Sequence, residues 1–206
     1  MKTFLLWLCF FSLVNLQGQK VVKKAFIGPR TASIHIDSQY CYQVELSTSN
    51  TDEVSVAASI EGEYAKDLLI SITESGTTVL VSTGFHPNFI NPNDKLSAHK
   101  VISIAMHINL PQYKEVHIYG TNSNVEVSGK YKKLEVKLAD GRCTLDNVAE
   151  NVVVNTQKGD IFLSTANGNI TANSTYGEVD EANIPMGHNQ YRLSTVEGNI
   201  HFRKTK

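Results

Sequence analysis

Apolar residues recur at a fixed spacing through the second half of the chain. Steps of nine residues from Val116 reach an apolar residue each time, and so do the positions two residues further on, except at Glu181. Each unit therefore reads apolar, polar, apolar, which is the period of a β-strand with one buried face. The first series is Val116, Val125, Leu134, Cys143, Val152, Ile161, Ile170 and Val179, and after a three-residue insertion Tyr191 and Ile200.

Glycines at every second unit distinguish between two folds that place a strand every nine residues. Gly141, Gly159 and Gly177 lie 18 residues apart, and Gly198 follows the insertion. In a β-solenoid, equivalent residues stack one coil later, whereas an antiparallel meander pairs residues mirrored about each turn. The pattern favours a solenoid with 18 residues per coil and one corner made of glycine, where a positive φ costs glycine least. The meander is the alternative.

The first half of the mature chain also alternates, but without the strict repeat. We expect residues 20–110 to form irregular, antiparallel strands that extend and cap the regular coils of residues 111–206, with both parts sharing one core. Ser75-Gly76 predicts a hairpin turn between two of these strands. Helical periodicity is absent throughout. The predicted fold is a single all-β domain over residues 20–206.

A proline-rich stretch separates the two halves. Residues 85–100 contain Pro87 and Pro92, which a central strand does not accommodate, and long loops in compact domains are often binding elements. Phe85, His86 and Phe89 are therefore candidate ligand contacts. In the alternative interpretation, the two phenylalanines pack over the end of the core and bind nothing.

The N-terminal residues predict export. Lys2 precedes a short apolar run, and Gly18 and Gln19 offer a cleavage site, so residues 1–19 are predicted to be a signal peptide. This run is shorter than the ~20 residues that span a bilayer, and the mature chain contains no other candidate transmembrane segment. We expect the mature chain in the periplasm, on the cell surface or secreted.

Charge and composition argue against several functions. The chain has 19 basic and 20 acidic residues and no basic run interleaved with aromatics, so nucleic acid is not an expected partner. Its seven histidines lack the spacing of metal ligands, so neither a metal nor another cofactor is expected. Cys41 and Cys143 could form a disulfide in an exported protein, but we expect them to be small buried hydrophobic residues.

Carboxylates at the glycine corner form the second candidate site. Asp160 and Glu178 are 18 residues apart, so sequential stacking would place them one strand spacing, ~4.8 Å, from each other. Arg142 and Asn199 would flank them. Paired carboxylates at that distance can perform acid–base chemistry or hold a cation. The alternative is a solvated corner, partly neutralised by Arg142. Asp160, Glu178 and Asn199 are thus candidate binding residues, and no residue is assigned a catalytic role.

Two features of the last coil depart from the repeat. Glu181 stands where the column requires an apolar residue, and an isolated buried carboxylate would cost several kcal/mol. We expect the strand to end at Val179 and the column to resume at Ala182 or Ile184. Residues 183–190 form an insertion before the repeat returns.

The order of these elements resembles a known family. A strand that ends in Leu110-Pro111 is followed by repeats such as Gly159-Asp160-Ile161 and Gly198-Asn199-Ile200, and this order is similar to the bacterial "putative adhesin" family. The likeness covers roughly residues 100–206. It implies a right-handed, single-stranded β-helix in a protein exposed at or outside the cell envelope. It implies no catalytic residues.

Three functions are open at this point. The outward positions of the repeat are polar and regular, which favours a non-catalytic, adhesin-like module that presents a flat surface to a glycan or an envelope protein. The second possibility is a polysaccharide-acting enzyme that uses Asp160 and Glu178. The third is a structural or regulatory component of an envelope assembly.

Overall fold

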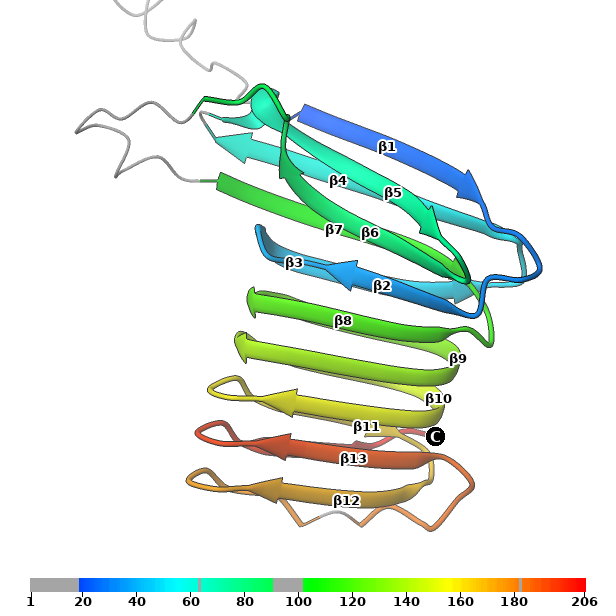
Figure 1. Ribbon diagram of the computed structural model, residues 1–206. Helices are drawn as coiled ribbons and strands as arrows, with labels where there is room; N and C mark the ends of the chain where they lie inside the picture. Colours follow the sequence, from blue (N-terminus) through cyan, green and yellow to red (C-terminus); the bar gives the residue numbers. More distant parts are fainter. Residues whose placement is uncertain (1–18, 63, 91–101, 182) are drawn as a thin grey trace, which may run out of the picture.

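The computed structural model describes residues 19–62, 64–90, 102–181 and 183–206, which form β-strands and a single short 3-10 helix at Ala65–Asp67 (Figure 1). The prediction of an all-β fold is confirmed. Residues 1–18 of the predicted signal peptide and residues 91–100 of the predicted loop lie outside the described residues. The strands are β1 (Gln19–Phe26), β2 (Ser33–Asp37), β3 (Cys41–Ser49), β4 (Glu53–Gly62), β5 (Leu68–Ser75), β6 (Thr78–Phe85), β7 (Ile102–Pro111), β8 (Glu115–Asn122), β9 (Asn124–Asp140), β10 (Cys143–Thr156), β11 (Ile161–Thr165), β12 (Asn169–Ser174), β13 (Gln190–Thr195) and β14 (Ile200–Lys204).

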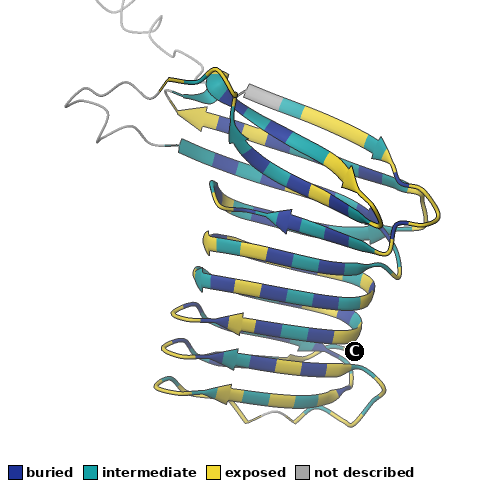
Figure 2. Ribbon diagram, in the orientation of Figure 1, coloured by how far each residue is buried: buried dark blue, intermediate teal, exposed yellow. Residues whose placement is uncertain are grey.

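The strands form two walls that face each other across a common apolar core (Figures 1 and 2). Wall A contains, in order, β5, β6, β2, β8, the second part of β9 (133–138), the second part of β10 (151–156), β13 and β12. Wall B contains β1, β4, β7, β3, the first part of β9 (124–127), the first part of β10 (143–146), β11 and β14. The long strands β9 and β10 therefore each bend from one wall into the other.

Parallel pairing in the middle of both walls follows the predicted period. Leu134 pairs with Val152 in wall A, and Cys143 pairs with Ile161 in wall B, each 18 residues later in the chain. These apolar residues are buried, and along each strand they alternate with residues that are exposed or partly exposed (Figure 2). Burial of a large apolar side chain contributes about 1.5–3 kcal/mol, so the inward columns hold successive coils together.

The last coil does not lie at the end of the stack. β13 pairs with β10 on one side and with β12 on the other, so Tyr191 lies between Val152 and Ile170. In wall B, β14 likewise lies between β11 and Val179. The insertion of residues 183–190 carries the chain back from the outermost level, and β13 and β14 intercalate between two earlier coils (Figure 1). Sequential stacking, which predicts Ile170 beside Val152, is wrong here.

The N-terminal part of the molecule repeats this arrangement. β2 pairs in parallel with β6 and β8, and β3 pairs in parallel with β7 and β9. The coil of β2 and β3 therefore intercalates between the coils β6–β7 and β8–β9, which are consecutive in the chain. The antiparallel pairs expected over residues 20–110 are restricted to β1 with β4, β4 with β7, and the β5–β6 hairpin, which turns at Gly76 as predicted.

Glycine forms a corner of the stack as predicted, although positive φ explains it at only one position. Gly141 alone among the four corner glycines has a positive φ, of 97°. At Gly159, Gly177 and Gly198, a Cβ would overlap the carbonyl oxygen of the glycine one level away. Close stacking of the corners therefore excludes a side chain. These contacts join the glycines in the order Gly141, Gly159, Gly198, Gly177, which is the order expected if the coil of Gly198 lies between those of Gly159 and Gly177.

Glu181 does not enter the core. It is exposed and belongs to no strand, and Val179 is the last bridged residue before it. Strand pairing stops at Val179, as expected, although Val179 forms only an isolated bridge and β12 already ends at Ser174. Ala182 lies outside the described residues, and Ile184 is half-buried.

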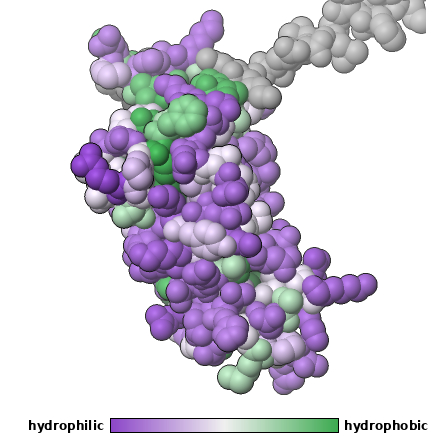
Figure 3. All heavy atoms as spheres, turned by 90° about the vertical axis from the view of Figure 1, so that its right-hand side faces the viewer, coloured by the Kyte–Doolittle hydropathy of each residue, from purple (hydrophilic) through white to green (hydrophobic). Residues whose placement is uncertain are grey.

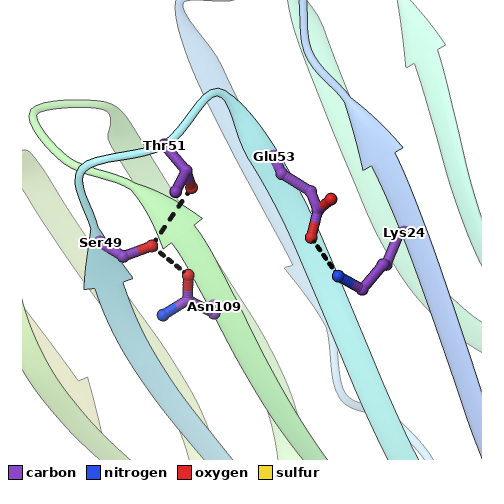
Figure 4. Close-up of polar contacts among 5 residues, drawn as sticks. All are labelled: Lys24, Ser49, Thr51, Glu53 and Asn109. Carbon is purple, nitrogen blue, oxygen red and sulfur yellow. Dashed lines mark hydrogen bonds and ion pairs between the residues drawn. The ribbon is translucent and has the colours of Figure 1, made fainter.

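The two ends of the stack differ in how they are protected. At one end, β1 is the edge strand of wall B and carries Lys23 and Lys24, with Lys24 Nζ 2.7 Å from Glu53 Oε1 (Figure 4). Lysines on an edge strand discourage pairing with other chains. At the other end, β12 is the outermost strand of wall A. In wall B the last named strand is β14, which is bridged on its outer side only by Val179 at Ile200 and which carries Arg203 and Lys204.

The outer surface is mainly polar. Figure 3 shows the side that carries the bends of β9 and β10, where hydrophilic residues cover most of the stack and hydrophobic atoms gather toward its N-terminal end. In the described ranges, no helix has the length and apolar character needed to cross a membrane.

Candidate functional site

The structure separates the two corner carboxylates that sequential stacking would have paired. Asn199, on the intercalated coil, lies between Asp160 and Glu178. Its backbone N–H donates to Asp160 Oδ1 at 2.8 Å, and its Oδ1 accepts from the backbone N–H of Glu178 at 2.8 Å. The side chains of Asp160 and Asn199 thus each accept a hydrogen bond from the backbone N–H of the adjacent corner, and the expected carboxylate pair is absent. Among the described residues, Arg142 and Asp160 form no ion pair, so the expected neutralisation by Arg142 is absent as well.

Phe85 and Phe89 pack together at the N-terminal end of the stack. Their rings stack with centroids 4.2 Å apart, and the Tyr64 ring lies 5.2 Å from that of Phe89. Phe85 packs against the buried core, whereas His86 is exposed. This cluster covers the end of the core, which agrees with the alternative interpretation of these aromatics. A ligand at Phe85, His86 or Phe89 stays a prediction.

A larger recess crosses the outer face of wall B. It has a volume of about 600 Å³ and runs over β4, β7, β3, β9, β10, β11 and β14. Because neighbouring strands are in register, their outward side chains form rows across the wall. We call this recess the wall B groove. Hydroxyl groups line much of it, from Ser47, Ser55, Ser128, Thr144 and Ser164.

Three carboxylates in the wall B groove each have a partner within the wall. The pairs are Glu45 Oε2 with His107 Nδ1 (2.8 Å), Glu126 Oε1 with Gln43 Nε2 (3.0 Å) and Asp146 Oδ1 with Asn147 Nδ2 (3.0 Å). In the last two pairs an amide N–H donates to the carboxylate. Each of these carboxylates therefore has one oxygen in a contact within the wall, while Glu126 and Asp146 keep their negative charge because an amide is neutral.

Hydrogen bonds fix the groove near β7. Asn109 Nδ2 donates to Ser47 Oγ at 3.0 Å, and the side-chain oxygen of Asn109 accepts from Ser49 Oγ. Ser49 in turn lies 3.2 Å from the hydroxyl of Thr51 (Figure 4). Both ends of the Asn109 amide are thus held, which gives this part of the groove a defined polar surface.

A smaller recess of about 240 Å³ continues the groove over β10, β11 and β14. It shares Thr144, Ser164 and Arg203 with the wall B groove. Arg142 and His201 complete its polar lining. We call this recess the basic pocket.

An aromatic ring organises the basic pocket. The Arg142 guanidinium lies 5.0 Å from the centroid of Phe162, and the His201 ring stacks on Phe162 at 4.7 Å. His201 Nδ1 also lies 3.0 Å from Asp180 Oδ2. Neither Arg142 nor Arg203 forms an ion pair with any residue that the structure describes. The positive charge of these two arginines is therefore unpaired among the described residues.

The outer face of wall A compensates its own charges. The partners of Glu135 are His117 (3.1 Å), Lys133 (3.7 Å) and Lys137 (2.6 Å). The hydrogen bond from Lys137 holds the pKa of Glu135 below its ordinary value. The His35 ring lies 4.8 Å from that of His117, and burial, followed by the charge of His117, lowers the pKa of His35.

Neither cysteine offers reactive chemistry. Cys41 and Cys143 are buried and unbonded, and burial raises the pKa of each thiol to about 12. The expectation that they are small buried hydrophobic residues is confirmed, and they do not form the alternative disulfide. Within the described part of the chain, no three His, Cys, Asp or Glu side chains are placed to hold a metal ion.

A family model matches most of the sequence. The model named Toastrack DUF4097 covers residues 31–206. The chain belongs to this family. The resemblance to the bacterial "putative adhesin" family that the sequence suggested is thereby confirmed. No curated protein matches the Toastrack chain.

Solved structures similar to this Toastrack chain have names that refer to adhesion. A "putative cell adhesion protein" from Clostridium sporogenes has 13% sequence identity and a TM-score of 0.50, over 91% of this chain and 100% of its own. A "putative adhesin" from Bacteroides fragilis has 13% identity and a TM-score of 0.37, over 89% and 97% of the two chains. A "putative adhesin" from Parabacteroides merdae has 14% sequence identity and a TM-score of 0.35, over 91% of this chain and 97% of its own. The first match supports the fold alone.

The basic pocket of this Toastrack chain was not predicted from the sequence. Its residues come from β10, β11 and β14, and only the intercalation of β14 brings Arg203 next to Ser164. One feature of the sequence could have indicated it. Phe162 occupies an outward position between inward Ile161 and Leu163, where the repeat otherwise places polar residues such as Glu126 and Thr144.

Proposed function

We propose that the mature chain is a non-catalytic, adhesin-like binding module, exported to the periplasm, the cell surface or the medium, whose partner is a glycan or an envelope protein. The wall B groove carries this proposal, because it is a long polar recess built on strands in register. We also propose that the winding is a right-handed β-solenoid, as the family resemblance implies. The name of the similar structure with a TM-score of 0.50, a "putative cell adhesion protein", agrees with this type of function.

The geometry favours binding over catalysis. The enzyme alternative depended on Asp160 and Glu178 as a carboxylate pair, and Asn199 separates them. In the groove itself, Glu45, Glu126 and Asp146 are each held by a partner on the wall. What the groove and the adjoining basic pocket leave available is a row of hydroxyl groups and two guanidinium groups, which suits recognition of a polar ligand.

A blocking substitution tests this function. Ser128 is exposed in the groove, so Ser128→Trp fills the recess without disturbing the core. Asn155→Trp on the outer face of wall A is the matched control, because Asn155 is also exposed. Residues 20–206 of each protein are applied to a glycan array and to purified envelope proteins. We expect a ligand that binds at micromolar concentration, loses binding with Ser128→Trp and keeps it with Asn155→Trp. Absence of any ligand, or equal loss in both variants, would contradict the proposal.

A further inference from the structure

We propose that the basic pocket binds acidic groups of an extended acidic polysaccharide, whose hydroxyl groups lie along the wall B groove. This inference rests on the proposed binding function and adds the chemical class of the ligand. It depends on four observations: the unpaired arginines, the aromatic ring that holds Arg142, the continuity of the basic pocket with the wall B groove, and the hydroxyl-rich lining of the groove.

The charges of the basic pocket select an anion. Arg142 and Arg203 form no ion pair with a described residue, and none of the described residues that line this pocket is acidic. Guanidinium groups bind carboxylates and sulfates through charge-assisted, often bidentate hydrogen bonds. Thr144 and Ser164 add two hydroxyl groups to the same pocket. An acidic group of the ligand is therefore expected over β10, β11 and β14, at the end of the groove away from Glu45.

The pocket is organised before any ligand arrives. The Phe162 ring lies between the Arg142 guanidinium and the His201 ring, and Asp180 holds His201 from the other side. A guanidinium held against an aromatic ring loses less conformational freedom on binding than a free one does. Because His201 is engaged by Asp180, the arginines supply the positive charge that is available to a ligand.

The continuity of the two recesses indicates an extended ligand. The basic pocket shares Thr144, Ser164 and Arg203 with the wall B groove. A chain with an acidic group in the basic pocket can therefore continue over the groove toward Ser128 and Ser47.

The lining favours a sugar chain over an acidic peptide. Peptides are usually recognised by pairing with a free strand edge or by inserting side chains into apolar pockets. The groove crosses the faces of strands that are paired on both sides, apart from β14, whose outer side is bridged only at Ile200. A peptide that lay along the groove would therefore cross these strands and not pair with their edges. Its outward lining is rich in hydroxyl groups, which exchange hydrogen bonds with sugar hydroxyls.

Titration calorimetry with polygalacturonate tests this inference on residues 20–206. We expect binding that weakens about 100-fold when the polymer is fully methyl-esterified, because two charge-assisted contacts are lost. Arg142→Gln with Arg203→Gln should weaken binding to the acid form by about 100-fold as well. The control pair Lys132→Gln with Lys137→Gln removes two exposed positive charges from outside the groove and should leave affinity within about twofold. The pair Arg142→Lys with Arg203→Lys keeps the charge but loses the guanidinium fork, so it should bind with intermediate affinity.

The outcomes separate this inference from the proposed function. Equal binding of acid and ester, full affinity in the Arg142→Gln, Arg203→Gln protein, or equal binding of polyglutamate would overturn an acidic polysaccharide as the ligand. If a neutral glycan or a protein binds instead and Ser128→Trp abolishes it, the binding function stands and this inference fails. If nothing binds, both fail. If the Arg142→Gln, Arg203→Gln protein does not fold, the Arg142→Lys, Arg203→Lys protein tests this inference, and full affinity in that protein would overturn it.

Discussion

The two intercalated coils are alike in construction and differ in charge. The coil of β2 and β3 brings Glu45 to the wall B groove, where His107 meets its carboxylate at 2.8 Å. The coil of β13 and β14 brings Arg203, which meets no carboxylate among the described residues. An intercalated coil alone therefore does not make a binding site. The coil with the unpaired charge marks the end of the groove where a ligand is expected.

Each coil is fixed in its level by hydrogen bonds to a neighbouring corner. For the N-terminal coil, the Ser123 hydroxyl lies 2.7 Å from the Cys41 carbonyl oxygen and 3.0 Å from that of Ser38. For the C-terminal coil, the Tyr191 hydroxyl donates to the Val148 carbonyl oxygen at 2.6 Å. Both contacts are buried, so they report directly on whether the coil is in place.

Among the substitutions that test the two intercalated coils, Gly198→Ala should have the largest effect on the free energy of unfolding. A Cβ at position 198 would overlap the carbonyl oxygen of Gly159, and backbone atoms cannot move aside as a flexible side chain can. We expect a loss of about 3 kcal/mol in the free energy of unfolding, measured by chemical denaturation.

Gly84→Ala is the matched control. Nothing lies within 4 Å of a Cβ at position 84, so the change should stay within about 0.5 kcal/mol. Similar stabilities for the Gly198→Ala and Gly84→Ala proteins would mean that β14 does not pass between its two neighbours at this corner.

Tyr191→Phe should have a smaller effect. It leaves the buried carbonyl oxygen of Val148 without its donor and also removes the contact with Thr165 Oγ1 at 3.1 Å. We expect a loss of about 1–3 kcal/mol in the free energy of unfolding with no change in the fold. An unchanged thermal midpoint would indicate that Tyr191 lies elsewhere than between Val152 and Ile170.

The smallest predicted effect concerns His35 in the N-terminal coil, which should make the stability of the folded state depend on pH. Burial and the nearby His117 lower the pKa of His35 in the folded state from 6.5. The unfolded state therefore binds a proton more readily, so the contribution of His35 to stability is present above about pH 6.5 and is lost as the pH falls below it.

We expect His35→Gln to reduce the fall in thermal midpoint between pH 7 and pH 5. His188→Gln, at an exposed position near the C-terminal coil, controls for the removal of a histidine. If both variants keep the full wild-type dependence on pH, His35 is not the group responsible.

The sequence predicted the coil but not the order of the coils. The nine-residue spacing of inward residues and the corner glycines specified strands, faces and a period, because burial imposes them locally. The order within the stack is different, since Ile170 and Tyr191 both present an apolar face that fits against Val152. The three-residue insertion marked the place where the order changes without indicating its direction.

The prediction that Asp160 and Glu178 form a carboxylate pair was wrong for the same reason. Asp160 and Glu178 were correctly placed at one corner, but Asn199 lies between them because its coil is intercalated. The basic pocket exists only in that order, since Arg203 neighbours Ser164 there. Residues on outward rows can be listed from the alternation alone, whereas their neighbours across strands depend on tertiary pairing.

Engineered disulfides test the strand order most directly. Asn155 and Ser194 are in register on adjacent strands, and Asn173 is in register with Ser194 on the strand beyond. Adjacent strands lie about 4.8 Å apart, which suits a disulfide, whereas a separation of two strands exceeds the limit of about 7 Å. The native Cys41 and Cys143 are buried and do not interfere. After mild oxidation, mass spectrometry of residues 20–206 should find the bridge in the Asn155→Cys, Ser194→Cys protein and none in the Asn155→Cys, Asn173→Cys protein. The reverse result would show that the coils stack in chain order, and the basic pocket would not exist.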